Sequence, residues 1–407
     1  MATTLATCDV LAIRERFPAL RRALGGRPVV YFDGPAGSQV PESVIEAVAR
    51  TLRDANANSH GAFATSREVD ALLEDARAAC ADLLGAPDRD CIAFGQNMTS
   101  LTFALSRSMM DRWDDGDEIV VTRLDHDANV WPWVTAARDA GARIRYAGIT
   151  PSCTLDLDEL RSLLSDRTRL VAIGAASNAV GTINPVKEIC ALAHDAGAEV
   201  FVDAVHYAPH GLIDVVDWDC DYLACSAYKF FGPHIGMLWG KRETMRSLRA
   251  YQVRPAGDEL PNRWMTGTQS HEAIAGTLAA IEYIASLGEG ATRRDAVVSA
   301  YRRIAAHERA LTDRMLAGLS AQSSFTTWGA AEHRAPTFGI THASRTAEDI
   351  AQHLGERGIF VWHGNFYALE LTTALDLEPD GMVRIGLLHY NTEAEVDRLL
   401  DELRDLG

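Results

Sequence analysis

The sequence lacks the features that mark several specialised classes of protein. No apolar run approaches the roughly 20 residues that a membrane-spanning helix needs. The amino terminus has no basic start followed by an unbroken apolar block, so we expect no signal peptide. Lys and Arg together number 39 against 56 Asp and Glu. The resulting net charge of −17 argues against binding to nucleic acid or to an anionic membrane, because both need a basic surface.

Cysteines are few, and their spacing fits neither a disulfide scaffold nor a metal site. The chain of 407 residues contains no CxxC motif and no His/Cys cluster, which argues against zinc, and we expect no bound metal. An odd number of cysteines in a long chain favours free thiols in a reducing cytoplasm. The seven are Cys8, Cys80, Cys91, Cys153, Cys190, Cys220 and Cys225.

Short β-rich runs alternate with helical stretches between about residues 92 and 240. Such alternation, with apolar strands, predicts a mostly parallel seven-stranded sheet that is covered by helices. Ligands in sheets of this kind bind beyond the carboxyl ends of the strands, so those loops are the places to search. The expected strands are 91–95, 118–122, 143–148, 169–174, 199–204, 222–226 and 236–240, with helices such as 132–140 and 187–197 between them.

A different pattern begins after LGEG at 287–290. A long helical stretch at 292–320 is followed by alternating short strands and helices, which predicts a smaller α+β domain. We therefore expect three parts: an N-terminal segment, 1–28, that packs with the small domain, a large cofactor-binding domain, 29–287, and a small C-terminal domain, 288–407.

Two chemically complementary residues follow neighbouring strands. Asp203 ends the run EVFVD, and Lys229 comes shortly after the run YLACS. Taken singly, Asp203 fits a helix cap and Lys229 fits a solvated loop lysine. Together they fit pyridoxal phosphate, which needs an amine to form a Schiff base and a carboxylate to keep its ring nitrogen protonated.

Other strand ends carry groups that suit the same cofactor. QNMTS at 96–100 lies between a strand and a helix, where backbone N–H groups and the Thr99 hydroxyl can meet a phosphate; a simple helix cap is the alternative. His126 can stack flat on the cofactor ring, and Asn178 can reach its phenolic oxygen or a substrate carboxylate. Ser226 and Tyr228 flank the lysine and are further candidates for phosphate contacts.

Several motifs resemble the class V aminotransferase family, and most closely its branch of cysteine desulfurases and selenocysteine lyases. The resemblance runs from about residue 28 to the end of the chain. It implies a type I pyridoxal phosphate fold, an amino-acid substrate and a homodimer with active sites at the interface. The motifs are YFDGPAGSQVP (31–41), NSHGAF (58–63), DHDANVWPW (125–133), SNAVGTINPV (177–186), VFVDAVHYAPH (200–210), SAYKFFGP (226–233), TGTQ (266–269) and VRIGLLHYNTEAEVDRLL (383–400).

The resemblance also implies roles for individual residues. Lys229 matches the catalytic Schiff-base lysine, Asp203 the partner of the pyridine nitrogen, and His126 the stacking histidine. Asn178 matches a substrate-holding residue, and Arg384 matches the group that clamps the α-carboxylate, a task that suits a bidentate guanidinium. The implied cofactor contacts further include Asn97, Met98, Thr99, His206, Ser226, Tyr228 and, from the neighbouring subunit, Thr268.

Three departures from the desulfurase pattern stand out. His206 replaces the usual glutamine near the phenolic oxygen, and Tyr228 replaces the histidine before the lysine. In the third, the segment GIFVWHGNFYA at 358–368 places Tyr367 where desulfurases carry the cysteine that takes up sulfur. A phenol cannot replace a thiolate in that role, and no cysteine lies beyond residue 225. We therefore expect no persulfide chemistry and no sulfur-accepting partner.

The remaining residues favour a C–S β-lyase that converts an S-substituted cysteine, through an aminoacrylate, into thiol, pyruvate and ammonia. Transamination, epimerisation and decarboxylating deamination stay open as alternatives, because they use the same cofactor chemistry. A protein that kept the fold without chemistry would be expected to lose Lys229 or Asp203. An aromatic pocket would suit a bulky substituent on sulfur. Its expected lining is Trp362, His363, Asn365, Phe366 and Tyr367, although this segment could instead be a packed loop.

Overall fold

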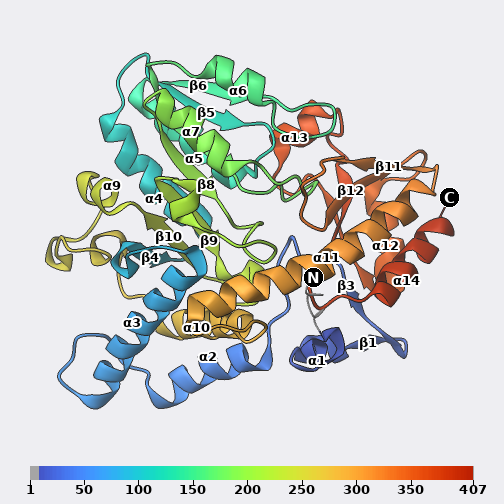
Figure 1. Ribbon diagram of the computed structural model, residues 1–407, viewed down its shortest axis with the longest axis horizontal. Helices are drawn as coiled ribbons and strands as arrows, with labels where there is room; N and C mark the ends of the chain where they lie inside the picture. The colour runs from blue at the N-terminus through green and yellow to red at the C-terminus, as the bar shows by residue number, and fades with distance from the viewer. Residues whose placement is uncertain (1–8, 407) are drawn as a thin grey trace, which may run out of the picture.

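A seven-stranded sheet forms the centre of the protein, whose computed structural model describes residues 9–406 (Figure 1). The strand order is β4-β10-β9-β8-β7-β5-β6; β10 runs antiparallel to β4 and β9, and the strands from β9 to β6 are parallel. The predicted sheet is confirmed, and the first and last residues of each strand lie within one residue of the expected positions. The bounds are β4 (Ile92–Gly95), β5 (Glu118–Thr122), β6 (Arg143–Ala147), β7 (Thr168–Gly174), β8 (Glu199–Asp203), β9 (Tyr222–Ser226) and β10 (Gly236–Gly240).

Helices surround this sheet and bury it. Strands β9 and β10 are buried along their whole length, which requires cover on both faces. Strand β6 differs because it lies at the sheet edge, and its Arg143 and Arg145 are exposed. The helices are α2 (Glu42–Asp54), α3 (Ala64–Leu84), α4 (Met98–Met109), α5 (Trp131–Ala140), α6 (Leu157–Leu163), α7 (Val186–Asp195), α8 (Val215–Trp218), α9 (Arg242–Ser247) and α10 (His271–Ala285).

A second, antiparallel sheet of four strands has the order β11-β12-β15-β14. It shares a separate hydrophobic core with α11, α12 and α14, in which Leu311, Ile350 and Leu399 are fully buried. The division of the chain at residue 287 stays a prediction. The bounds are α11 (Arg293–Ser320), β11 (Phe325–Trp328), β12 (Thr337–His342), α12 (Ala347–Glu356), β13 (Ile359–Phe360), β14 (Trp362–Gly364), α13 (Leu369–Ala374), β15 (Met382–Gly386) and α14 (Glu393–Arg404).

The start of the described chain contacts the part that contains the four-stranded sheet. Helix α1 (Val10–Glu15) carries Arg14, which forms an ion pair of 2.8 Å with Glu395 and donates a hydrogen bond to the Tyr390 carbonyl. After a hairpin of β1 (Ala23–Leu24) and β2 (Arg27–Pro28), strand β3 (Val30–Tyr31) pairs in parallel with β13. Residues 1–8 of the predicted N-terminal segment, Cys8 among them, lie outside the described residues.

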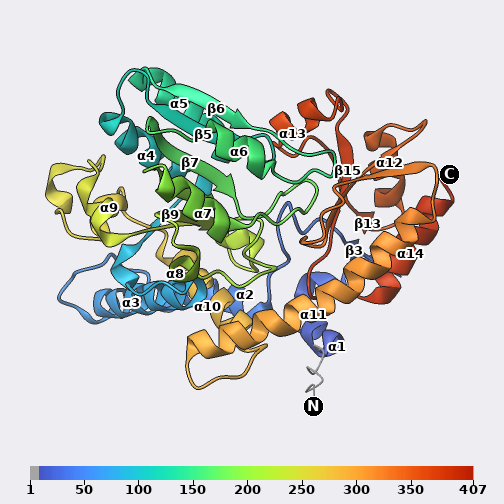
Figure 2. The same ribbon diagram turned by 45° about the horizontal axis from the view of Figure 1, so that its top comes forward.

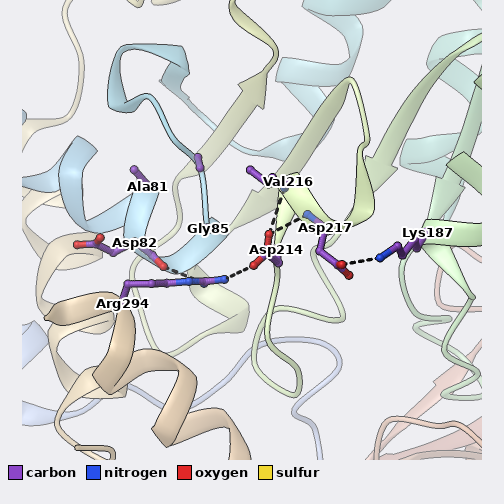
Figure 3. A pocket seen from close by; sticks show the side chains of 9 residues that line it. Ala81, Asp82, Gly85, Lys187, Asp214, Val216, Asp217 and Arg294 are labelled. Atoms are coloured by element: carbon purple, nitrogen blue, oxygen red, sulfur yellow. Dashed lines mark hydrogen bonds and ion pairs between the residues drawn. The ribbon is translucent and has the colours of Figure 1, made fainter. Parts of the chain in front are cut away.

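The long helix α11 contributes its first half to the core around the seven-stranded sheet and its second half to the core of the four-stranded sheet (Figures 1 and 2). Thr292 and Asp295 form a capping box at its start, which fixes where the helix begins. In its first turn, Arg294 donates hydrogen bonds to carbonyl groups at the end of α3 and to Ile213, and it pairs with Asp214 before α8 at 3.0 Å (Figure 3). This guanidinium therefore anchors α11 to the larger part of the molecule.

Residues 9–406 contain neither a membrane-spanning helix nor a disulfide. None of the helices between residues 9 and 406 has the length and apolar character needed to cross a bilayer. The six cysteines in that range are buried and form no disulfide.

Candidate active site

A cavity lies at the carboxyl ends of five strands of the large sheet, where the sequence predicted a ligand site. Residues after β4, β5, β7, β8 and β9 reach it, because these strands end at the same edge. Most predicted site residues line it, and their roles remain predictions. The predicted residues among the lining are Asn97, Met98, Thr99, His126, Asn178, Asp203, His206, Ser226, Tyr228 and Lys229, and Asp125 also lines the cavity.

Lys229 ends the short helix Ala227–Lys229 that follows β9, and its side chain is buried. Its Nζ donates a hydrogen bond to the carbonyl of Pro35. Burial and the positive charge of Arg384 together lower the pKa of this amine to about 7, although Asp203 partly opposes the shift. Near neutral pH a large fraction of the amine is therefore uncharged and able to attack a carbonyl group.

Asp203 is the last residue of β8 and is also buried. Burial raises the pKa of its carboxyl to about 6, against the effect of a 2.8 Å hydrogen bond from the Val205 N–H and of the charge on Lys229. At neutral pH the group is mostly ionised. A carboxylate that is shielded from water in this way can form an ion pair with the protonated pyridine nitrogen of the cofactor.

Asp125 is a site residue that the sequence analysis did not single out. It accepts hydrogen bonds from the Gly174 N–H at 2.8 Å and from the Asn129 amide at 3.2 Å. A Cβ on Gly174 would lie 2.7 Å from the Asp125 carboxylate, so glycine is needed for this contact. Burial raises the pKa of Asp125 to about 8, and the Asp203 charge adds to the shift. Asp125 thus ties the loop that carries His126 to the end of β7.

His126 caps the short helix Asp127–Asn129, and its Nδ1 accepts a hydrogen bond from the Ala128 N–H at 3.0 Å. Burial, together with the charges of Lys229 and Arg384, lowers the pKa of the ring to about 3, so the imidazole is neutral. Since Nδ1 is an acceptor, the single ring proton lies on Nε2. Tyr367 stacks on this ring, with the ring centroids 5.4 Å apart and the planes at 22°.

The loop 96–100 is built as a helix start against β10. Asn97 caps α4 by accepting hydrogen bonds from Ser100, and the Met98 N–H donates to the Ser226 hydroxyl at 3.0 Å. A Cβ on Gly236 would lie 2.3 Å from the Asn97 carbonyl carbon, so only glycine lets β10 pass so close. The resulting helix amino terminus, with Thr99 exposed beside it, suits a phosphate.

Arg384 reaches the same region from β15 of the other sheet. Its Nη1 donates to the Asn178 carbonyl at 3.1 Å, and its guanidinium lies 4.2 Å from the centre of the Phe366 ring. Burial lowers the pKa of Arg384 to about 9, although the Asp33 carboxylate opposes the shift. The Asn178 amide donates to the Phe366 carbonyl at 2.9 Å.

The remaining predicted residues do not line the cavity in the single chain. Trp362 is 52% and Tyr367 is 72% exposed, and His363 is exposed on β14 between them. Asn365 donates to Glu378 and accepts from the Tyr367 N–H. Thr268 is exposed before α10 and is not among the residues that line the cavity. Two residues of the 362–368 segment touch cavity residues: Tyr367 stacks on His126, and the Phe366 carbonyl accepts a hydrogen bond from Asn178.

The chemistry of the cavity fits pyridoxal phosphate. It combines an amine of lowered pKa, a buried carboxylate, a neutral stacking ring and a helix amino terminus. Among the buried side-chain atoms that have no hydrogen-bond partner within residues 9–406, two belong to residues that line the cavity: Asn178 Oδ1 and His206 Nδ1. Buried polar atoms are almost always partnered in proteins, so both indicate a polar ligand.

Comparison with known proteins places these residues in a family context. The family model for class V aminotransferases matches residues 30–399. A cysteine desulfurase of Synechococcus elongatus is 33% identical over 97% of the chain, and the chain spans 63% of that relative's length. A probable cysteine desulfurase of Streptomyces coelicolor is 32% identical, with 97% of this chain and 96% of the relative covered.

Solved structures agree with that match. The cysteine desulfurase CsdA of Escherichia coli superposes with a TM-score of 0.86 at 27% identity, over 98% of each chain. A C-DES mutant with glycine covalently linked to its PLP cofactor gives a TM-score of 0.82 at 20% identity, over 97% of this chain and 99% of the other. The second likeness concerns the fold alone.

Proposed function

The chain belongs to the class V aminotransferase family and is a pyridoxal phosphate-dependent enzyme, and we propose that it is a C–S β-lyase acting on an S-substituted cysteine. The observation that carries the proposal is the place of Tyr367. Its ring covers His126 at the cavity, in the segment where the family resemblance expects a sulfur-accepting cysteine.

The buried thiols support this choice. Burial raises the pKa of Cys80, Cys91 and Cys190 to about 12, and it also raises the pKa values of Cys153, Cys220 and Cys225. A thiol of raised pKa forms little thiolate and is a poor sulfur acceptor. None of these six lies in the 362–368 segment.

The residues of the cavity divide the work of the reaction. Bound pyridoxal phosphate withdraws electrons from the substrate's α-carbon. Asp203 would hold the ring nitrogen of the cofactor protonated, and Lys229 would bind the cofactor and accept the α-proton at Nζ. Arg384 would bind the α-carboxylate with two of its five N–H groups, since the Asn178 carbonyl engages only one of them, on Nη1.

The neutral His126 would pack on the cofactor ring with one face and on Tyr367 with the other. Elimination breaks the Cβ–S bond, and the sulfur leaves with a proton as a thiol. With one added water, the carbon skeleton ends as pyruvate and ammonia, so the reaction balances without an oxidant.

The assembly is part of the proposal. We propose a homodimer in which Thr268 of the partner subunit completes the phosphate site, because Thr268 is exposed and does not line the cavity of its own chain. Light scattering after gel filtration should give twice the mass of 44.3 kDa. A monomer that retains full cofactor binding would contradict this part.

A direct assay tests the reaction. The purified enzyme is incubated with S-alkyl and S-aryl cysteine conjugates, and free thiol and pyruvate are measured. We expect equal amounts of both, none with Lys229→Ala, and no protein-bound persulfide when cysteine itself is supplied. Exchange of the α-proton with deuterated water without thiol release would favour epimerisation, and release of carbon dioxide would favour decarboxylating deamination. Formation of a keto acid with the sulfur retained would favour transamination, and any of these results would overturn the lyase.

A further inference from the structure

His206 is a cavity residue with one satisfied and one unsatisfied ring nitrogen. Its Nε2 lies 3.0 Å from the hydroxyl of Thr337, whereas its Nδ1 is buried and has no partner within residues 9–406. The ring lines the cavity together with Lys229 and Asp203. Nδ1 is therefore the atom of His206 that remains to interact with a ligand.

Thr337 comes from the first residue of β12, in the other sheet, and is fully buried. Its backbone position is fixed independently of His206, since its N–H donates to the Ala335 carbonyl and its own carbonyl accepts from Arg334. Within the described chain its hydroxyl makes no other hydrogen bond than the one to His206. The hydroxyl proton thus has a single available acceptor, the Nε2 lone pair.

Charge decides which form of His206 is present. Burial lowers the pKa of the ring, and the charges of His210, Lys229 and Arg384 lower it further, so the ring is neutral. His210 meets it edge to face at 5.3 Å and is itself paired with Glu308 at 2.9 Å. A neutral imidazole carries one proton, either on Nδ1 or on Nε2.

The two forms differ in how many buried groups they satisfy. With the proton on Nε2, the Thr337 hydroxyl proton has no acceptor, and Nδ1 is left as a buried lone pair without a donor. With the proton on Nδ1, Thr337 donates to Nε2, and Nδ1 offers an N–H to an acceptor on the ligand. Unsatisfied buried polar groups are costly, so the second form is favoured.

We propose that Thr337 is a positioning residue that donates a hydrogen bond from its hydroxyl group to Nε2 of His206. This bond keeps the proton of His206 on Nδ1, where it is available to the phenolic oxygen of bound pyridoxal phosphate. This inference rests on the proposed placement of the cofactor in the cavity and not on the lyase reaction. It links a strand of the four-stranded sheet to the electronic state of a cofactor held at the ends of the seven-stranded one.

The spectrum of the bound cofactor gives a test without substrate. A hydrogen bond to the phenolic oxygen stabilises the negative charge of that oxygen most when the nitrogen that links the cofactor to Lys229 has lost its proton, because that proton otherwise interacts with the same oxygen. Removing the donor should therefore raise the pH midpoint of the absorbance change of the lysine-linked cofactor. We expect Thr337→Val to raise this midpoint by about one pH unit, and Thr337→Ser, which keeps a hydroxyl, to leave it near the wild-type value.

A double-mutant cycle separates positioning from a general structural effect. A glutamine amide nitrogen carries protons in every form, so a His206→Gln enzyme no longer depends on Thr337. We expect Thr337→Val to shift the midpoint in the wild-type background and not in the His206→Gln background. Thr341→Val is the matched control, because Thr341 lies on the same strand and its hydroxyl bonds Trp328 instead.

Two results would overturn the proposal: an unchanged midpoint in Thr337→Val with the cofactor fully bound, or equal shifts in both backgrounds. Should the valine variant not fold, Thr337→Ala removes the hydroxyl without adding a methyl group and is judged by the same criteria. Because no substrate is added, a failed lyase assay does not affect either result.

Discussion

The cavity and the segment 362–368 beside it, called here the buried wall and the exposed wall of the site, are built by opposite means. One wall consists of short loops at the ends of buried parallel strands, where Asp203 and Lys229 are held with almost no exposure to solvent. The other is the segment 362–368, where Trp362 and Tyr367 are largely exposed. Phe366 and Tyr367 both have φ of 57°, a left-handed conformation that is uncommon for aromatic residues.

The difference shows how the chemistry is distributed. The buried wall shifts pKa values through desolvation and offers groups of fixed position, which suits the binding and activation of a cofactor. The exposed wall touches the buried one at few points: the Phe366 carbonyl on Asn178, the Tyr367 carbonyl on the Asp127 N–H at 2.6 Å, and the two ring contacts. We therefore expect changes in the buried wall to abolish the reaction and changes in the exposed wall to alter the choice of substrate.

The largest effect is expected at the centre of the buried wall. Lys229→Ala removes both the amine that holds the cofactor and the base for the α-proton, so turnover should fall by at least about 10³-fold. The visible absorption band of the lysine-linked cofactor should disappear. Lys187→Ala, at a surface ion pair with Asp217, is the matched control and should keep both band and turnover. An unchanged absorption band in Lys229→Ala would show that Lys229 does not hold the cofactor, and the role given to the buried wall would be wrong.

A smaller loss is expected at Arg384, which the four-stranded sheet places beside the buried wall. Arg384→Lys keeps the charge but loses the bidentate geometry, so kcat/KM should fall about 10- to 100-fold, mainly through KM. Substrate titrations under steady-state conditions measure this. Arg169→Lys, in a partly exposed pair with Asp117, should change neither constant. An equal loss in kcat with KM unchanged would show that Arg384 does not bind the ground-state substrate.

The pH dependence of cofactor loading probes the same wall. The amine of Lys229, with a pKa of about 7, must be uncharged to react with the cofactor's carbonyl group. The rate of loading into the cofactor-free enzyme should rise about tenfold per pH unit below 7 and level off above it. Stopped-flow absorbance between pH 5.5 and about 9 measures this. A rate that still rises beyond pH 9 would show an amine of ordinary pKa.

The smallest effect is expected at the exposed wall. Tyr367→Ala removes the ring stacked on His126, which is worth about 0.5–1.5 kcal/mol, so kcat/KM should fall about two- to tenfold. The loss should be larger for bulky aromatic conjugates than for small alkyl ones, and the cofactor band should stay. Tyr251→Ala, another exposed tyrosine, should have no effect. Loss of the cofactor in Tyr367→Ala would contradict the separation of the two walls.

Predictability differs between the walls for physical reasons. Apolar runs revealed the seven strands because a sheet covered on both faces needs them, and Asp203 and Lys229 followed from strand ends. Asp125 was missed because an acidic residue before a short helix resembles a cap, and its contact with Gly174 joins separate strands. The left-handed backbone at Phe366 and Tyr367 has no signal in the residue types, since it is held by contacts with Asn178 and Asp127.

The sequence by itself determined the class of fold, the family and the residues suited to pyridoxal phosphate, because strand periodicity and motif order are local properties of the chain. Only the tertiary structure decided that the Lys229 pKa falls to about 7, that Tyr367 covers His126, and that Thr337 meets His206 across 131 positions. These features depend on desolvation and on contacts between distant segments, which arise when the two sheets come together.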